Sequence, residues 1–247
     1  MDLTQRIDDS RKTGILDVSH MNLTSLPELP DNLTQLDCSN NRLTSLPRLP
    51  PNLRELDVFM NQLTSLPPLP THLVALACNS NRLTQLPPLP PTLEALYCLN
   101  NELTSLPNLP ESLDVLWCSD NRLTELPTLP TKIDSLVVHN NPFKPAVQSI
   151  LDQYYEDLPQ FITSINHYVE KEKIKRDAKQ LMALKLSKIG NKAPTNISRK
   201  IEKHLGFNIA RPAGNNAGPG IDKKLFNLRG NYYGPKKSRR RNKKRVL

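Results

Sequence analysis

Residues 23–42 read LTSLPELPDNLTQLDCSNNR, and this stretch decides the fold because it recurs along the chain. Five further copies follow at a constant spacing of 20 residues, beginning at Leu43, Leu63, Leu83, Leu103 and Leu123. The segment ILDVSHMN, residues 15–22, fits the end of an earlier, truncated unit. Self-similarity at a fixed period predicts a solenoid, in which each supersecondary unit buries its apolar face against the next.

The shared pattern, L-x-x-L-P-x-L-P-x-x-L-x-x-L-x-C/V-x-x-N-x, contains the leucine-rich repeat signature L-x-x-L-x-C/V-x-x-N-x-L. The alternation in its second half predicts a short strand, with Leu36 and Cys38 inward and Gln35, Asp37 and Ser39 outward. Neighbouring units then stack these strands in parallel. We therefore expect an α/β repeat solenoid of about seven repeats over residues 15–142, with the strands on its concave face.

Two further positions recur in every unit. After each strand an amide side chain can bond backbone groups of adjacent turns, at Asn41, Asn61, Asn81, Asn101, Asn121 and Asn141, whereas the first unit has Met21 instead. Before each strand the sequence LPxLP disfavours a helix, because proline removes a donor and pushes the preceding residue out of the α region. We expect an extended, polyproline-like convex side.

These repeats resemble those of the bacterial type III effectors of the YopM and IpaH kind, with similar repeats in large DNA viruses. The residues that carry the resemblance are the LTSLPxLPxxLxxLxCxxNx units from Leu23 to Pro142, about half the chain. The resemblance implies a host-directed protein that binds other proteins through its concave face. The ubiquitin-ligase domain of the enzymatic members is not expected, because only 105 residues follow Pro142 and the last cysteine is Cys118. The family's N-terminal helical hairpin is reduced to a short cap, residues 1–14.

The outward strand positions are the candidate binding site. The N-terminal units carry acidic residues there, and the C-terminal units carry apolar and aromatic ones, including the only tryptophan. Tyrosine and tryptophan are typical interface anchors. The candidate partner-binding residues are Asp37, Asp57, Phe59, Tyr97, Leu99, Trp117 and His139. Two other interpretations stay open: the aromatic residues only stabilise the sheet by cross-strand stacking, or the C-terminal helices fold over them.

No motif for catalysis or metal binding stands out. Cys38, Cys78, Cys98 and Cys118 share an inward strand position with Val58 and lack the paired spacing of a zinc site. The histidines are scattered, and no glycine-rich phosphate loop is present. We therefore expect a non-enzymatic protein with no cofactor, no metal and no small-molecule substrate.

Beyond Pro142 the pattern becomes helical. We expect one helix over residues 145–157, a second over 160–189 and a short third over 197–205, so that residues 143–205 form a helical cap and extension. Val147, Ile150, Leu151 and Tyr154 would cover the open end of the solenoid, since a terminal unit needs a cap. The alternative is a partner-binding hairpin.

Charge is distributed unevenly between the two halves of the chain. Residues 1–141 have 9 Lys and Arg against 16 Asp and Glu, a net charge of −7, whereas residues 142–247 have a net charge of +16. The final segment, 206–247, is polar and rich in Gly and Pro, so we expect a disordered basic tail. Its basic clusters are Lys223, Lys224, Lys236, Lys237, Arg239, Arg240, Arg241, Lys243, Lys244 and Arg245.

The spacing of these clusters resembles a bipartite nuclear-import signal, which an importin would bind. The alternative is contact with nucleic acid phosphates. The first 20 residues lack a Sec-type signal peptide, and no apolar run is long enough to span a membrane. We expect a cytoplasmic location, with the host-cell cytoplasm and nucleus as the alternative, and the main function we expect is binding of a partner protein.

Overall fold

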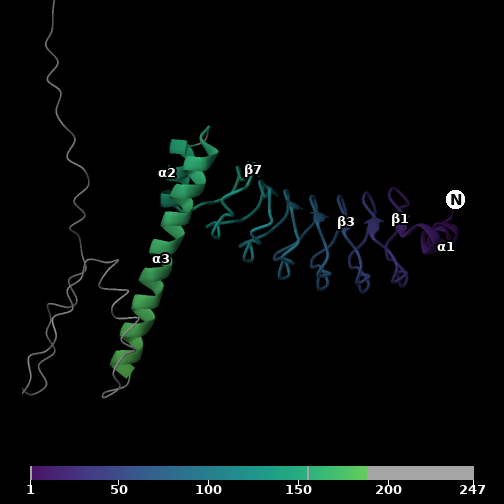
Figure 1. The fold of residues 1–247 in the computed structure, drawn as a ribbon, viewed down its shortest axis with the longest axis horizontal. Coiled ribbons are helices and arrows are strands. Elements are labelled where there is room, and N and C mark those ends of the chain that lie inside the picture. The colour runs from purple at the N-terminus through teal and green to yellow at the C-terminus, as the bar shows by residue number, and fades with distance from the viewer. Residues whose placement is uncertain (1, 155, 188–247) are drawn as a thin grey trace, which may run out of the picture.

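The computed structural model describes residues 2–154 and 156–187, with side chains described through Leu181. Its centre is a seven-stranded parallel sheet in which each strand pairs with the next along the chain, from β1 to β7. The strands are three residues long and pair in register at intervals of 20 residues. The repeats therefore form one elongated stack, with one strand per unit, as Figure 1 shows. The strands are β1 (Ile15–Asp17), β2 (Gln35–Asp37), β3 (Glu55–Asp57), β4 (Ala75–Ala77), β5 (Ala95–Tyr97), β6 (Val115–Trp117) and β7 (Ser135–Val137).

The core is a continuous apolar column inside the stack. Leu36 and Cys38 are 2% and 0% exposed, and their equivalents in the other units are also buried, except Leu136 of the last unit, which is partly buried. Leu33 and its equivalents before each strand also lie in this core. Burial of one such leucine contributes roughly 1.5–3 kcal/mol, but only when a neighbouring unit covers it. The predicted inward positions are confirmed.

The expected extended back is also confirmed. Residues 23–34 of the first full unit form neither helix nor strand, and the other units repeat this conformation. A turn follows the second proline, where the N–H of Leu33 donates to the carbonyl of Pro30 (3.3 Å). The two prolines of each unit have no backbone N–H to donate to a helical or strand hydrogen bond, which explains why this side remains extended.

The prediction that Ser39 faces outward is wrong, because Ser39 is buried at 6% exposure, and the equivalent Ser119 is buried at 1%. Regular alternation stops at Asp37, whose carboxylate accepts a hydrogen bond from the N–H of Ser39 (2.9 Å). The chain then turns, and the next residue, Asn40, has a positive φ of 54°. A small side chain at position 39 is therefore taken into the turn and does not continue the strand face.

A positive φ recurs at this position of every unit, which the sequence analysis did not predict, and Asn22 of the truncated first unit has one as well. It occurs at His20, Asn40, Met60, Ser80, Asn100, Asp120 and Asn140. Asn and Asp tolerate this left-handed conformation better than other residues that carry a Cβ. The signal was present in the sequence, since four of these seven positions are Asn or Asp.

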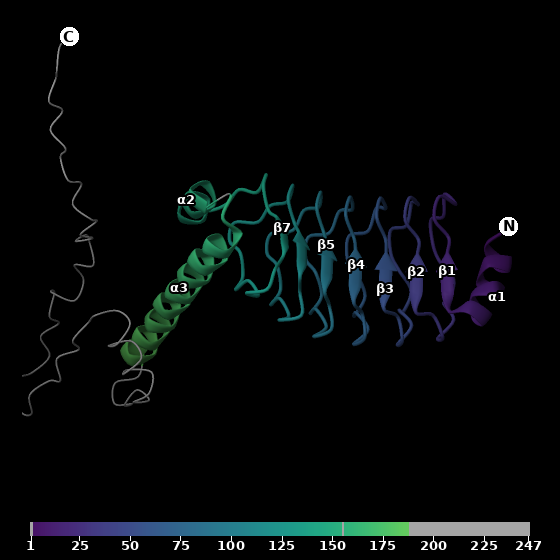
Figure 2. The same ribbon diagram turned by 45° about the horizontal axis from the view of Figure 1, so that its top comes forward.

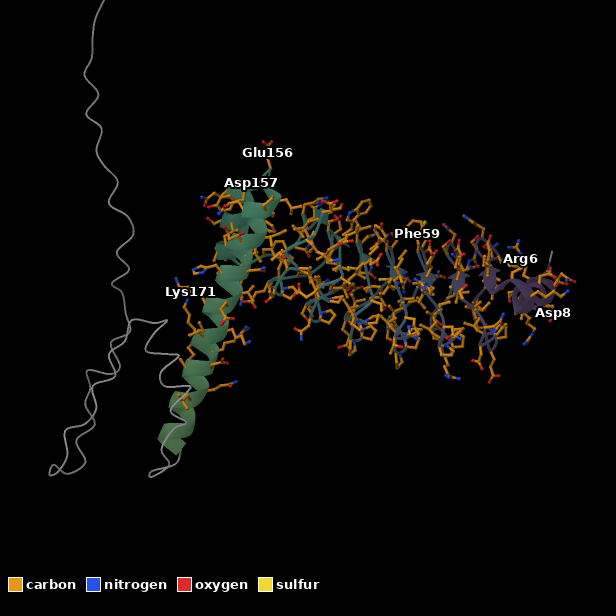
Figure 3. The ribbon with its side chains drawn as sticks, in the orientation of Figure 1. Arg6, Asp8, Phe59, Glu156, Asp157 and Lys171 are labelled. Carbon is orange, nitrogen blue, oxygen red and sulfur yellow. The ribbon has the colours of Figure 1, made fainter. Side chains whose placement is uncertain are left out.

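The N-terminal end of the stack is covered by helix α1 (Leu3–Thr13). Asp2 caps this helix by accepting from the N–H of Gln5, and Gly14 ends it with a left-handed φ of 72°. Leu3 and Ile7 pack against the core. Arg6 lies where α1 meets the first strand (Figure 3), and its Nη1 donates to the carbonyl of Asp17 (2.7 Å).

The C-terminal end is covered by α2 (Pro145–Tyr154) and α3 (Leu158–Ser187). Val147 is buried, and Ile150, Leu151 and Tyr154 pack against the core, as expected. Helix α3 adds Phe161, Ile162 and Ile165, and the side chain of Asn166 makes two hydrogen bonds to the backbone of Leu129 (2.7 and 2.8 Å). The end of the stack thus gains both apolar cover and a polar link.

The expected helix boundaries are corrected in two places. The first helix ends at Tyr154 and not at residue 157, and the second begins at Leu158 and not at residue 160. Pro159 therefore lies inside the first turn of α3, where the missing N–H has no intrahelical acceptor to lose. The expected end of this helix at residue 189, the short helix over 197–205 and the basic tail lie outside the described residues.

Candidate protein-binding face

The concave face, defined here as the outward side chains of β1 to β7, is the candidate site. None of the described helices lies across these strands, because α1 and the α2–α3 pair occupy the two ends of the stack (Figure 2). The expectation that the C-terminal helices fold over the aromatic residues is therefore not met. In-register pairing lines up equivalent residues across neighbouring strands, about 4.8 Å apart.

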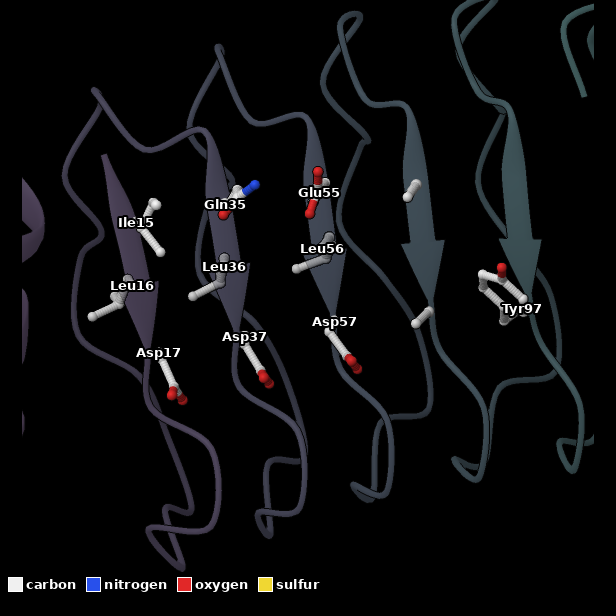
Figure 4. A pocket seen from close by; sticks show the side chains of 12 residues that line it. Ile15, Leu16, Asp17, Gln35, Leu36, Asp37, Glu55, Leu56, Asp57 and Tyr97 are labelled. Carbon is white, nitrogen blue, oxygen red and sulfur yellow. The ribbon is translucent and has the colours of Figure 1, made fainter. Parts of the chain in front are cut away.

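The N-terminal part of the concave face carries a row of carboxylates. Asp17, Asp37 and Asp57 come from successive strands and point the same way, as Figure 4 shows. Each accepts a hydrogen bond from the N–H two residues later, at 2.9, 2.9 and 2.8 Å. The same backbone turn therefore fixes all three side chains.

Two of these carboxylates differ in acidity. Hydrogen bonds from the N–H and hydroxyl of Ser19 lower the pKa of Asp17, with help from the nearby Arg6. Burial raises the pKa of Asp57, and the charge of Asp37 on the neighbouring strand raises it further. The ionised form of Asp57 is therefore less favourable than that of Asp17, because partial desolvation and repulsion between like charges both disfavour a charged carboxylate.

Next to this row the face is hollowed. The outward residues of β4 are Ala75 and Ala77, so the surface falls away between the carboxylates and Tyr97. The resulting hollow has a volume of about 280 Å³ and extends from Ile15 and Asp17 to Tyr97. The repeat pattern puts these alanines at outward positions but does not identify them as functional. The hollow could have been predicted from their small size, because no other unit has two alanines at these positions.

The C-terminal part of the concave face holds an aromatic pair. Tyr97 and Trp117 are paired across β5 and β6, with ring centroids 5.0 Å apart in an edge-on arrangement of 87°. The indole Nε1 of Trp117 donates to the hydroxyl of Ser135 on the next strand (2.8 Å). Even so, 36% of Trp117 remains exposed. Cross-strand stacking therefore occurs, and it holds a large aromatic surface in a fixed orientation toward solvent.

The other candidate residues are more dispersed. Phe59 and Leu99 are half-buried and lie just beyond their strands, and His139 is exposed in the last unit. Asp37 and Asp57 lie on neighbouring strands, and one strand, β4, separates the strand of Asp57 from that of Tyr97. The structure therefore brings four of the predicted residues together in two pairs, the acidic Asp37 and Asp57 and the aromatic Tyr97 and Trp117, with the alanines of β4 between the pairs. The basic residues of the tail, from Lys223 to Arg245, lie outside the described residues.

The four cysteines are core residues in the structure. All are free and buried, and burial raises the pKa of Cys78 and of Cys118 to about 12. They are therefore neutral thiols at physiological pH. Within the described residues, no group of His, Cys, Asp and Glu is arranged to hold a metal ion. No helix in this part of the chain has the length and apolar character needed to cross a membrane.

Comparison with known proteins agrees with this fold. A family model described as leucine-rich repeats (2 copies) matches residues 31–71. No curated protein sequence gives a significant match. A solved Shigella effector leucine-rich repeat domain superposes with a TM-score of 0.54 at 30% identity, covering 63% of this chain and 82% of the domain.

Two YopM structures are also similar. YopM from Yersinia enterocolitica WA-314 is 38% identical, with a TM-score of 0.47, and the match covers 51% of this chain and 33% of YopM. YopM from Yersinia pestis is 30% identical, with a TM-score of 0.47, over 56% of this chain and 52% of that one. The chain thus spans only a third to a half of the YopM chains that it matches. It belongs to the leucine-rich repeat proteins and resembles the YopM and IpaH effectors; this fold is typical of protein–protein interaction.

Proposed function

We propose that this chain is a non-enzymatic module that binds a partner protein through its concave face, as a host-directed effector acting in host-cell cytoplasm. The observation that carries the proposal is Trp117, the only tryptophan of the chain, held one third exposed on a face that no described helix covers. A solenoid gains little from a tryptophan facing solvent, whereas a protein interface gains a large anchor from it.

The similarity to the Shigella effector leucine-rich repeat domain supports the effector part of the proposal. The presence of an acidic row and an aromatic pair on the same face supports the proposal that the face binds a protein. The aromatic pair would supply affinity, because large rigid side chains bury much area at small entropic cost. The row of Asp17, Asp37 and Asp57 would orient a basic region of the partner and speed the encounter.

The experiment is a pull-down from eukaryotic cell extract with the full chain, at moderate and high salt, in which proteins and nucleic acids are both quantified. Wild type is compared with the double variant Tyr97→Ala/Trp117→Ala. The matched control is Thr84→Ala/Thr104→Ala, which trims two exposed residues outside the concave face. We expect a protein partner that survives high salt, is retained by the control and is lost with the aromatic double variant.

A different pattern would contradict this function. If only nucleic acid is captured, if high salt releases it and if the aromatic double variant captures as much, then the basic tail carries the activity. Binding to phosphates through counterion release has this steep salt dependence. In that case the repeats serve as a scaffold, and nuclear import or nucleic-acid contact becomes the function to pursue.

A further inference from the structure

We propose that the concave face is a docking surface for the chain's own basic segment, Lys236–Arg245, which competes there with the partner protein. This inference rests on the proposed function, because it concerns the same face and adds its regulation. It is carried by the charge of the face, by the shape of the hollow and by the length of chain that follows α3.

Most of the acidic charge of the concave face has no ion-pair partner among the described residues. Asp37, Glu55 and Asp57 lie on two adjacent strands, and no Lys or Arg among residues 2–154 and 156–181 forms an ion pair with any of them. Asp17 has a cation near it, with Nη1 of Arg6 3.8 Å from its Oδ1. Like charges facing one another across strands disfavour the isolated sheet, so a cationic occupant relieves an unfavourable arrangement.

The shape of the face fits lysine and arginine in particular. These side chains have a charged end and an apolar stem, and the stem can lie along apolar surface. The alanine floor at Ala75 and Ala77 lies directly beside Asp57 and is closed on its other side by Tyr97. Stems lying over the alanines would bring their charged ends to the carboxylates on one side and to the faces of aromatic rings on the other.

The dimensions match a segment of this length. Asp17 on β1 and Trp117 on β6 are separated by five inter-strand spacings, which is about 24 Å at about 4.8 Å per spacing. Ten extended residues span roughly 33 Å, and eight of the ten residues from Lys236 to Arg245 are Lys or Arg. An extended Lys236–Arg245 can therefore reach from the aromatic pair to the far end of the carboxylate row.

The connection is also long enough. Residues 188–235 separate the end of α3 from the basic segment. Fully extended, this stretch spans roughly 160 Å, whereas α3 is about 45 Å long at 1.5 Å per residue. Because the segment is tethered to the same chain, its effective concentration at the concave face can reach about the millimolar range. A basic partner that is not tethered must therefore displace the segment before it binds.

Trp117 provides the measurement, because it is the only tryptophan and lies at one end of the proposed path, beside Tyr97. The full chain is compared with a variant in which all eight basic residues of Lys236–Arg245 are serine. We expect acrylamide to quench Trp117 less in the full chain than in this variant at low salt. The difference should disappear at about 1 M salt, where charges are screened beyond about 3 Å.

A synthetic peptide of residues 236–245 then tests the site directly. We expect it to protect Trp117 of the serine variant and to bind the full chain about tenfold more weakly, because the tethered segment occupies the face. In the serine variant, Asp37→Asn/Asp57→Asn should weaken peptide binding. The control Glu28→Gln/Glu111→Gln removes the same charge from exposed positions of the convex side and should leave peptide binding unchanged.

Two results would overturn the inference. One is equal quenching and equal peptide affinity for the full chain and the serine variant. The other is a quenching difference that rises with protein concentration, which would mean docking on a second copy. Neither result touches the proposed function, because capture of a partner protein by wild type, and its loss in Tyr97→Ala/Trp117→Ala, is measured in a separate experiment.

Discussion

Asn81 is hydrogen-bonded to the carbonyl of Val58, 23 residues earlier, through an Nδ2–O distance of 2.9 Å. Its Oδ1 accepts from the N–H of Leu63 at 3.0 Å, so one side chain links the strand end and the following turn of the preceding unit. Nδ2 also reaches the carbonyls of Cys78 and Asn79 in its own unit, both at 3.2 Å. The amide thus satisfies buried backbone groups at the place where the strand ladder ends.

We expect Asn81→Ala to lower the free energy of unfolding by about 1–3 kcal/mol, because the N–H of Leu63 loses its acceptor inside the stack. Chemical denaturation measures this change. Asn108→Ala is the matched control, since Asn108 is exposed on the LPxLP side, and it should change stability little. Equal stability of the two variants would show that water replaces the Asn81 hydrogen bonds.

The Asn ladder illustrates what the sequence can predict. Every unit has the same period, so one backbone environment repeats, and Leu36, Cys38 and Asn41 identify the same positions in each copy. To predict these positions it is enough to know whether each side chain points inward or outward. The start of α3 at Leu158 was missed because a proline is a weak guide to a helix boundary: it is excluded from the interior but accepted in the first turn.

Met60 occupies the left-handed position of its unit, with φ of 50°. An unbranched apolar side chain has no hydrogen bond with which to compensate that conformation, and Met60 is 50% exposed, so little burial depends on it. We expect Met60→Asn to raise the free energy of unfolding by about 1 kcal/mol. The reverse substitution, Asn100→Met, at φ of 53°, should lower it by a similar amount. A loss of stability in Met60→Asn would show that the packing of Met60 outweighs its backbone strain.

Asp17 and Asp57 should respond to pH in opposite ways. The pKa of Asp17 is lowered by its hydrogen bonds to Ser19, so this group stabilises the fold above its ordinary pKa of 3.8, and the stabilisation is lost as pH falls through its lower folded value. The pKa of Asp57 is raised, chiefly by burial, so its ionised form costs stability above the folded pKa, and the cost disappears below about pH 3.8.

The Asn variants test this difference by thermal unfolding. Asn keeps an oxygen that can accept from the N–H of Phe59, so Asp57→Asn should raise the melting temperature at about pH 7 and change it little at about pH 3. Asp17→Asn should lower the melting temperature at about pH 7, with a smaller effect at about pH 3. Shifts of the same sign for both variants at neutral pH would contradict the electrostatic account of the carboxylate row.

The site was less predictable than the fold, for a physical reason. Alternation places Tyr97 and Trp117 on one face and in register, but their edge-on contact depends on side-chain torsions that no repeat pattern specifies. The bond from the Trp117 indole to Ser135 depends on the same torsions. The hollow over Ala75 and Ala77 depends on what larger neighbours leave empty, which is a property of the assembled sheet and not of any one unit.

If Trp117 is a binding residue, its removal should weaken partner binding without unfolding the stack. Its contact with Tyr97 should contribute about 0.5–1.5 kcal/mol, because edge-on aromatic pairs are of that strength. We expect Trp117→Ala to cost little more than this. Its neighbour Leu116 is fully buried, so Leu116→Ala should cost about 2–5 kcal/mol. A double-mutant cycle with Tyr97→Ala would isolate the pair term. If Trp117→Ala proves as destabilising as Leu116→Ala, Trp117 is a structural residue of the sheet, and loss of partner capture in its variant would report unfolding and not recognition.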